Sequence, residues 1–172
     1  MDYQSLSKLI PVEKSERDEM FFLIALATTA RADCTRRQVG CIAVSPDYRV
    51  VATGYNAPPK GEQSACEKGI ADRDKKICCK QPCDPPNSSY DKCNALHAEM
   101  NALAQLGSTN HYKYVDLYLV GRDGKTGKLL DIGTPCILCS RHIKNFNIRH
   151  IKVLTKDGEV VILDKERLET TA

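Results

Sequence analysis

The sequence lacks a long hydrophobic run, a strong charge of either sign, an internal repeat and a low-complexity tract. Its longest nearly unbroken apolar segment, residues 20–27, is far too short to span a bilayer. Residues 1–20 are polar and contain no apolar stretch of the kind found in signal peptides. The net charge is only +3, from 25 basic and 22 acidic residues, without the basic stripe typical of nucleic-acid binders. We therefore expect a cytoplasmic protein with no membrane partner, and the charge argues against a nucleic-acid partner.

The composition and the hydrophobic patterns predict a single α/β domain. A length of 172 residues with 42% hydrophobic content suits one domain over 1–172, with loose ends at 1–13 and 165–172. A capping box at Ser15–Asp18 is expected to open the first helix, and Pro135 fits the entry to the last one. The order of elements predicts one sheet with helices on its faces. The patterns predict helices over 15–31, 96–106 and 136–146, and strands over 39–44, 49–53, 115–120, 151–154 and 160–163.

Nine cysteines are many for a chain expected in a reducing compartment. Because disulfides are disfavoured there, metal binding or catalysis is the better interpretation. Five of the cysteines and five of the eight prolines lie within residues 57–93, a segment of little periodicity. We interpret this segment as a cysteine-rich insertion that needs something to hold it in place.

Two short motifs carry the chemistry. His97-Ala98-Glu99 is followed by Pro135-Cys136-Ile137-Leu138-Cys139, and the pair matches H-x-E…P-C-x-x-C, the signature of zinc-dependent deaminases. One imidazole and two thiolates would hold zinc and leave the fourth position open for water, as catalytic zinc requires. The alternative is a structural zinc site, but such a site needs a fourth protein ligand and gives the carboxylate of the first motif no purpose.

Each residue of the two motifs has an expected role. Cys136 and Cys139 are three positions apart at a helix start, where they share a face and the helix N-terminus favours thiolates. His97 at the start of the other helix would bind the same metal. Glu99 would act as general acid and base, taking a proton from water and returning it to a ring nitrogen and the departing ammonia. The free amide of Ala98 would donate to a substrate carbonyl.

Three longer stretches resemble the deoxycytidylate deaminase branch of the cytidine deaminase-like superfamily. Cys34-Thr35-Arg36-Arg37-Gln38-Val39-Gly40-Cys41 is similar to the entrance of that family's first strand. Thr53-Gly54-Tyr55-Asn56-Ala57-Pro58 is similar to the turn after its second strand. Cys93-Asn94-Ala95-Leu96-His97-Ala98-Glu99-Met100-Asn101-Ala102 resembles its zinc helix. The resemblance covers roughly residues 15–155.

The resemblance implies a three-layer α/β/α fold with a five-stranded mixed sheet. It implies that His97, Cys136 and Cys139 bind the catalytic zinc, that Glu99 is the general acid/base, and that Asn56 hydrogen-bonds the sugar or base. It also implies a homo-oligomer, often a hexamer in the family, and a possible deoxynucleoside triphosphate effector.

Some members of the family carry a second, structural zinc that ties the insertion to the core. Cysteines fall at matching places here, and a closed thiolate site would explain how the insertion is held. The alternative is a cluster of free thiols. The ligands expected by resemblance are Cys34, Cys66 and Cys93, with Cys83 as the fourth, a place that Cys78 or Cys79 could also fill.

The leading hypothesis is the deamination of deoxycytidylate (dCMP) to deoxyuridylate (dUMP) with release of ammonia. Arg36 and Arg37 are candidates for the substrate phosphate, since guanidinium groups bind phosphate in a bidentate manner. The alternatives are a deaminase for another nucleoside, nucleobase or modified cytosine nucleotide, a tRNA or DNA base deaminase, and a non-catalytic zinc-binding protein. The chain departs from the family at residues 122–134, where 14 positions separate Gly121 from Pro135 (135 minus 121) and the strand does not run directly into the second motif.

Overall fold

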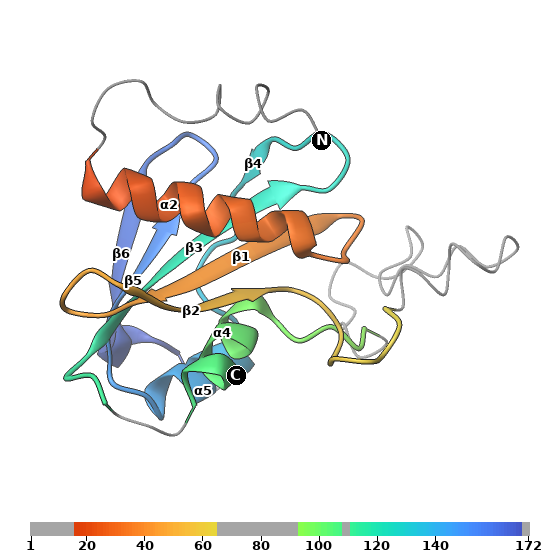
Figure 1. The fold of residues 1–172 in the computed structure, drawn as a ribbon. Coiled ribbons are helices and arrows are strands. Elements are labelled where there is room, and N and C mark those ends of the chain that lie inside the picture. The colour runs from red at the N-terminus through yellow and green to blue at the C-terminus, as the bar shows by residue number, and fades with distance from the viewer. Residues whose placement is uncertain (1–15, 65–92, 108–110, 170–172) are drawn as a thin grey trace, which may run out of the picture.

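A mixed β-sheet organises residues 16–64, 93–107 and 111–169, the part of the chain that the computed structural model describes (Figure 1). The strand order is β2-β1-β3-β5-β6, and β4 pairs with β3 outside this order. The neighbours β3 and β5 run parallel, whereas the other pairs are antiparallel. The strands are β1 (Arg37–Val44), β2 (Val50–Tyr55), β3 (Val115–Asp123), β4 (Leu129–Leu130), β5 (Ile148–Leu154) and β6 (Val160–Asp164).

The central strands are apolar on both faces because both faces are covered by helices. Successive side chains of a strand point to opposite faces. In β3, Leu117 and Leu119 therefore belong to one buried cluster, and Tyr118 and Val120 to the other. No helix among the described residues is long and apolar enough to cross a membrane.

Among the described residues, α-helices cover both faces of the sheet (Figure 1). Helix α2 (Arg17–Thr28), continued by the short 3-10 helix η1 (Thr29–Arg31), packs on the face with Tyr118. Helices α4 (Ala98–Leu106) and α5 (Ile137–Lys144) contact each other on the opposite face. The chain therefore has the three-layer α/β/α arrangement that the family resemblance implied.

The sheet has six strands, and the expected number of five is corrected. Strand β3 continues beyond its pairing with β5, which ends at Leu119. Beyond this point the short β4 pairs with the same edge of β3: Gly121 pairs with Leu130, and Arg122 pairs with Leu129. Because β4 contains only two residues, the short run at residues 128–132 is not recognisable as a strand from the sequence.

The ends of two segments also differ from the expectations. The N-cap of α2 is Glu16 and makes no side-chain capping hydrogen bond, so Asp18 does not complete a capping box at this helix start. In the expected loose end at 165–172, residues 165–167 form the 3-10 helix η2 (Lys165–Arg167) and Leu168 is buried in the core. Ser15, residues 1–13 and most of the expected insertion, residues 65–92, lie outside the described residues.

Gly54 allows β2 and α4 to approach each other closely. A Cβ placed on Gly54 would lie 2.1 Å from the carbonyl oxygen of Ala98 and 2.5 Å from the backbone nitrogen of Ala102. We expect Gly54→Ala to destabilise the protein by about 3 kcal/mol, at the upper end for overpacked cores, because backbone atoms must move. Chemical denaturation measures the effect, with Thr53→Ala on the same strand as the control. A loss no greater than that of the control would contradict this close contact.

Asp18 links α2 to the sheet instead of capping its helix. Its carboxylate accepts hydrogen bonds from the Lys152 ammonium at 2.7 Å and from the Tyr118 hydroxyl at 2.6 Å. Burial opposes ionisation, but the hydrogen bonds from Lys152 and Tyr118 outweigh it and lower the pKa of Asp18 from 3.8. This carboxylate therefore stabilises the fold above pH 3.8, and the contribution is lost as the pH falls through its lower folded-state pKa.

A substitution of Asp18 tests this link. We expect Asp18→Asn to cost about 0.5–1 kcal/mol at pH 7, since the ion pair is partly exposed and screened. The difference from the native protein should shrink as the pH falls below 3.8. Denaturation midpoints across pH 2–7 measure it, and exposed Glu159, changed to Gln, is the control. A penalty that stays constant over this range would contradict the assignment.

Candidate active site

The starts of α4 and α5 bring the two sequence motifs together on one face of the sheet. His97 is the N-cap of α4 and Cys136 is the N-cap of α5, and neither side chain caps its own helix. Serine, threonine, aspartate or asparagine at an N-cap is worth about 1 kcal/mol to a helix. Both helices forgo this stabilisation, and the two side chains point toward each other instead. Pro135 directly precedes the N-cap of α5, at the entry to the helix.

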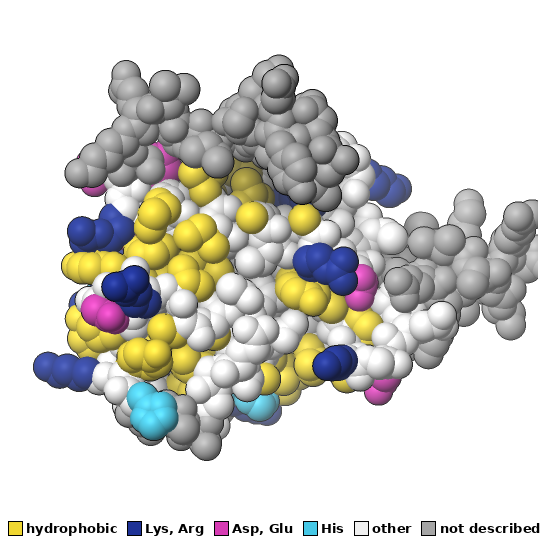
Figure 2. Space-filling view, in the orientation of Figure 1, with side chains coloured by type: hydrophobic (Ala, Val, Ile, Leu, Met, Phe, Trp, Pro, Cys, Tyr) yellow, Lys and Arg dark blue, Asp and Glu magenta, His cyan; other side chains and the backbone are white. Residues whose placement is uncertain are grey.

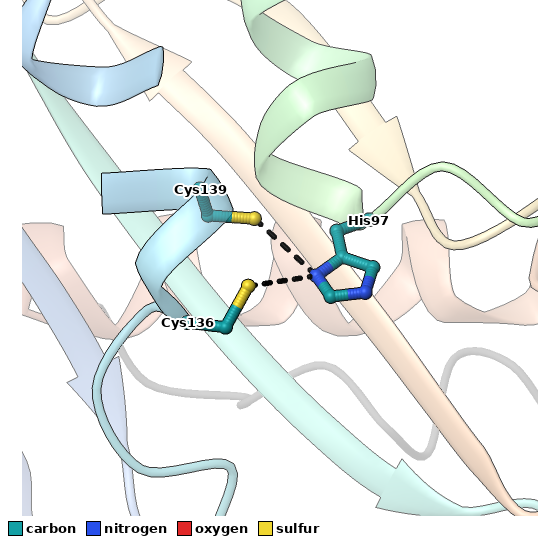
Figure 3. A group of neighbouring side chains, drawn as sticks. All are labelled: His97, Cys136 and Cys139. Atoms are coloured by element: carbon teal, nitrogen blue, oxygen red, sulfur yellow. Dashed lines mark hydrogen bonds between the residues drawn. The ribbon is translucent and has the colours of Figure 1, made fainter. Parts of the chain in front are cut away.

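His97, Cys136 and Cys139 form a compact group (Figure 3). The Nδ1 atom of His97 lies 3.3 Å from the Sγ atom of each cysteine. Around one tetrahedral zinc, a nitrogen and a sulfur ligand are about 3.6 Å apart. The donor set and its spacing therefore fit zinc, with three protein ligands and one position left for a water or substrate atom.

The charges of the group also suit a cation. Hydrogen bonds from Cys139 and His97 lower the pKa of the Cys136 thiol to about 3, so this sulfur is a thiolate at neutral pH. The hydrogen bond to Cys136, together with burial, raises the pKa of Cys139. The hydrogen bond with Cys136 likewise raises the pKa of His97. A divalent cation would replace the protons that the three groups now share.

Glu99 stands next to this group, in the first turn of α4. Its side chain is only 6% exposed and forms a hydrogen bond with Cys139. Burial raises the pKa of its carboxyl group. The neighbouring Ala98 is the first residue of α4, so its amide has no acceptor within the helix. A proton-transfer group and a free hydrogen-bond donor thus lie beside the predicted metal position.

A cavity of about 300 Å³ opens at this point, and several of the expected substrate-binding residues line it. Asn56 and Arg37 lie on its wall with His97, Ala98 and Glu99. The Asn56 side chain accepts a hydrogen bond from the Val39 amide and donates one to the Arg37 carbonyl, each at 2.8 Å. These two bonds hold Asn56 at the end of β2 and leave one amide hydrogen and one lone pair for a ligand.

The two expected arginines are placed differently. Arg37 lines the cavity, whereas Arg36 is exposed outside its lining, and the Arg36 carbonyl accepts the Gly124 amide at 2.9 Å. Arg37 is the first residue of β1, whereas Arg36 precedes the strand.

Ser140 and Ile132 contribute to the site, and the sequence interpretation missed both. Ser140 is buried, and its hydroxyl donates to the Pro135 carbonyl at 3.1 Å, which fixes the turn that carries Cys136. Ile132 lines the cavity. A serine inside an amphipathic helix has no distinctive pattern, but its position directly after the second motif was an available signal.

The expected structural zinc site falls largely outside the described residues. Cys66, Cys78, Cys79 and Cys83 are not described, whereas Cys34 and Cys93 line the same cavity as the His97 group. A second zinc therefore stays a prediction.

Comparisons with known proteins point to the same family as the sequence motifs. Residues 15–155 match the family model described as the cytidine and deoxycytidylate deaminase zinc-binding region. A deoxycytidylate deaminase of Schizosaccharomyces pombe is 31% identical over 134 residues, which are 78% of this chain and 35% of that protein. A deoxycytidylate deaminase of Mycobacterium phage D29 is 30% identical over 142 residues, which are 81% of this chain and 95% of that protein. The chain thus spans about a third of the yeast relative and nearly all of the phage one.

A solved structure shows the same fold. The dCMP deaminase of the cyanophage S-TIM5 in its apo form has a TM-score of 0.54 at 22% identity, and the match covers 83% of this chain and 86% of that one. The same enzyme is known in complex with dCMP and dUMP, and this form matches with a TM-score of 0.53. The match to the family model covers both motifs and all three stretches of resemblance. The chain therefore belongs to the family of the cytidine and deoxycytidylate deaminase zinc-binding region.

Proposed function

We propose that the protein is a zinc-dependent deaminase that converts dCMP to dUMP and ammonia. The observation that carries the proposal is the convergence of His97, Cys136 and Cys139 with the buried Glu99 at one cavity. The curated relatives are deoxycytidylate deaminases, and the cyanophage enzyme is known with both dCMP and dUMP. Because metal binding at this site needs reduced thiols, we infer that the protein works in a reducing compartment such as the cytoplasm.

The site residues divide the work of a hydrolytic deamination. The chemistry that zinc supplies at such a site is a water acidic enough to lose its proton near neutral pH. Glu99 would take this proton at a carboxylate oxygen and deliver it to the ring nitrogen; it would then take the second proton, from the new hydroxyl on the reacting carbon, and deliver it to the departing amine. The oxygen of water forms the new carbonyl, the carbon–nitrogen bond breaks, and the amine leaves as ammonia. The raised pKa of Glu99 suits a group that must both accept and donate protons.

The remaining cavity residues would bind and orient the nucleotide. The Ala98 amide donates to the ring carbonyl, and the unused donor and acceptor of Asn56 meet the sugar or base. Arg37 on the cavity wall binds the phosphate, whereas Arg36, outside the cavity lining, stays a candidate for this contact. Regulation by a deoxynucleoside triphosphate stays a prediction of the family resemblance.

The decisive experiment measures ammonia release by zinc-loaded protein with dCMP, cytidylate, deoxycytidine, cytosine, guanine and an adenosine-containing tRNA hairpin. We expect turnover of dCMP, with a kcat/KM at least a hundredfold above that for deoxycytidine. An equal kcat/KM for deoxycytidine and dCMP would contradict the proposed contact with the phosphate. Turnover of a different compound alone would show that dCMP is not the substrate. No turnover by the zinc-loaded protein with any of these compounds would contradict the enzymatic function.

The outer face of α2 supports assembly into a homo-oligomer through two copies of this helix. Hydrophobic side chains gather over α2 in Figure 2, and Met20 is 43% exposed. Met20, Leu23 and Ala27 of α2 and Ala30 of the following η1 are spaced by three, four and three residues. In an antiparallel pair, Met20 would share a layer with the second copy's Ala30, and Leu23 with its Ala27. Large residues would thus meet small ones, as tight helix packing requires.

A charge on this face should separate the copies. We expect Leu23→Glu to shift the native oligomer to a smaller species in analytical ultracentrifugation while the zinc content stays unchanged. Lys113→Glu, an exposed change outside α2, is the control. An unchanged sedimentation coefficient for Leu23→Glu would exclude this interface.

A further inference from the structure

Gly121 and Ile132 form a wall of the cavity as a pair. Gly121 follows Leu119 by two positions in β3, so both face the helices α4 and α5. A Cβ placed on Gly121 would lie 2.1 Å from the Cγ2 atom of Ile132. Ile132 therefore fills the space that a side chain at position 121 would take, and it lines the cavity beside Leu119.

The segment that carries Ile132 is held at both of its ends. On one side, Leu130 pairs with Gly121 in the β3–β4 ladder. The adjacent Asp131 accepts the Lys156 amide at 2.9 Å and pairs with its ammonium at 3.3 Å. On the other side, Gly133 takes a left-handed conformation, with a φ of 69°, which turns the chain toward the second motif. The departure from the family pattern at residues 122–134 thus places Ile132 at a defined position.

The cavity wall near Ile132 is apolar. Val39 and Leu119 contribute from neighbouring positions of β1 and β3, since Val39 pairs directly with Gly121. Both of these residues lie in strands of the sheet, whereas Ile132 comes from a connecting segment. Its size can therefore set the width of the cavity without a change in the fold.

We propose that Ile132, seated on Gly121, is a specificity-determining residue that limits the size of the base that the cavity accepts. An aminopyrimidine such as cytosine fits against the isoleucine, whereas a bulkier base would clash with its side chain. The inference rests on the proposed function, because it assigns the apolar wall to the reacting base.

A double-mutant cycle tests the pair. Gly121→Ala should push Ile132 toward the substrate and raise the KM for dCMP at least tenfold, within the 10–200-fold range of pocket methylene contacts. Ile132→Ala should widen the cavity and favour a cytosine nucleotide with a methyl group added to its ring, so that kcat/KM for this larger substrate rises at least fivefold relative to dCMP. The double variant should return the KM for dCMP to within threefold of the native value, because the new methyl group occupies the vacated space.

Controls separate this inference from the proposed function. Leu129→Ala changes a neighbouring residue that packs against the α2 side of the sheet. It should leave unchanged both the KM for dCMP and the kcat/KM of the larger substrate relative to dCMP. Calorimetric binding of dUMP gives a second readout that needs no turnover, and thermal midpoints confirm that each variant is folded. Native protein that binds dUMP but does not deaminate dCMP would contradict the proposed function alone. If the effects of Gly121→Ala and Ile132→Ala on the KM or on dUMP binding simply add in the double variant, the proposed role of Ile132 is wrong.

Discussion

Glu99→Gln is expected to reduce kcat for dCMP about a thousandfold while the protein stays folded and binds zinc. General acid–base groups contribute roughly 10²–10⁴-fold to rates, and this carboxyl is the proton-transfer group within reach of the metal position. Glutamine preserves the shape and can still hydrogen-bond Cys139, but it cannot carry the proton. Because the site already disfavours the charged carboxylate, a neutral amide should cost little stability.

The measurement combines steady-state kinetics with metal analysis and a thermal midpoint for the same preparation. Glu19→Gln removes an exposed carboxylate of α2, on the face of the sheet opposite the cavity, and should keep native kinetics. Turnover by Glu99→Gln within tenfold of the native rate, with zinc bound, would falsify the assigned role of Glu99.

The sequence predicted most helices and strands from apolar runs and helical spacing, although β1 and β3 are buried on both faces and β6 is largely exposed. The two motifs at residues 97 and 136 were correctly expected at helix starts, and their side chains meet as the predicted metal site requires. The fold class followed from the family resemblance and from the order of elements. Family membership came from particular residue types at particular spacings, a signal that does not depend on tertiary packing.

The remaining features depend on contacts between distant residues, which no local pattern encodes. Asp18 was expected to cap its own helix, but Lys152 and Tyr118 attract it to the sheet. Strand β4 exists because β3 is longer than its neighbour β5, a fact of the sheet and not of residues 129–130. Ile132 could not be found from sequence, since its importance follows from the absence of a side chain at Gly121, eleven positions earlier (132 minus 121).

Removal of the metal is expected to lower the thermal midpoint by about 10 °C. Zinc bound at a thousand times its dissociation constant adds about 4 kcal/mol to the free energy of unfolding. For a domain of this size each kcal/mol corresponds to about 2–4 °C. Without the cation, two sulfurs and an imidazole are left crowded at the starts of α4 and α5, where no side chain caps either helix.

Cys139→Ala should reproduce the effect of chelation and lower the zinc content by one equivalent per chain, which elemental analysis detects even when a second zinc is present. Chelator should then have little further effect at this site. Cys41 provides the matched control, because it is a fully buried cysteine of the same core cluster with no part in the His97 group. Cys41→Ala should lose some packing stability but keep its zinc and its response to chelator. Full zinc retention by Cys139→Ala would mean that the sulfur is a packing group, and the metal would have to be held by other residues.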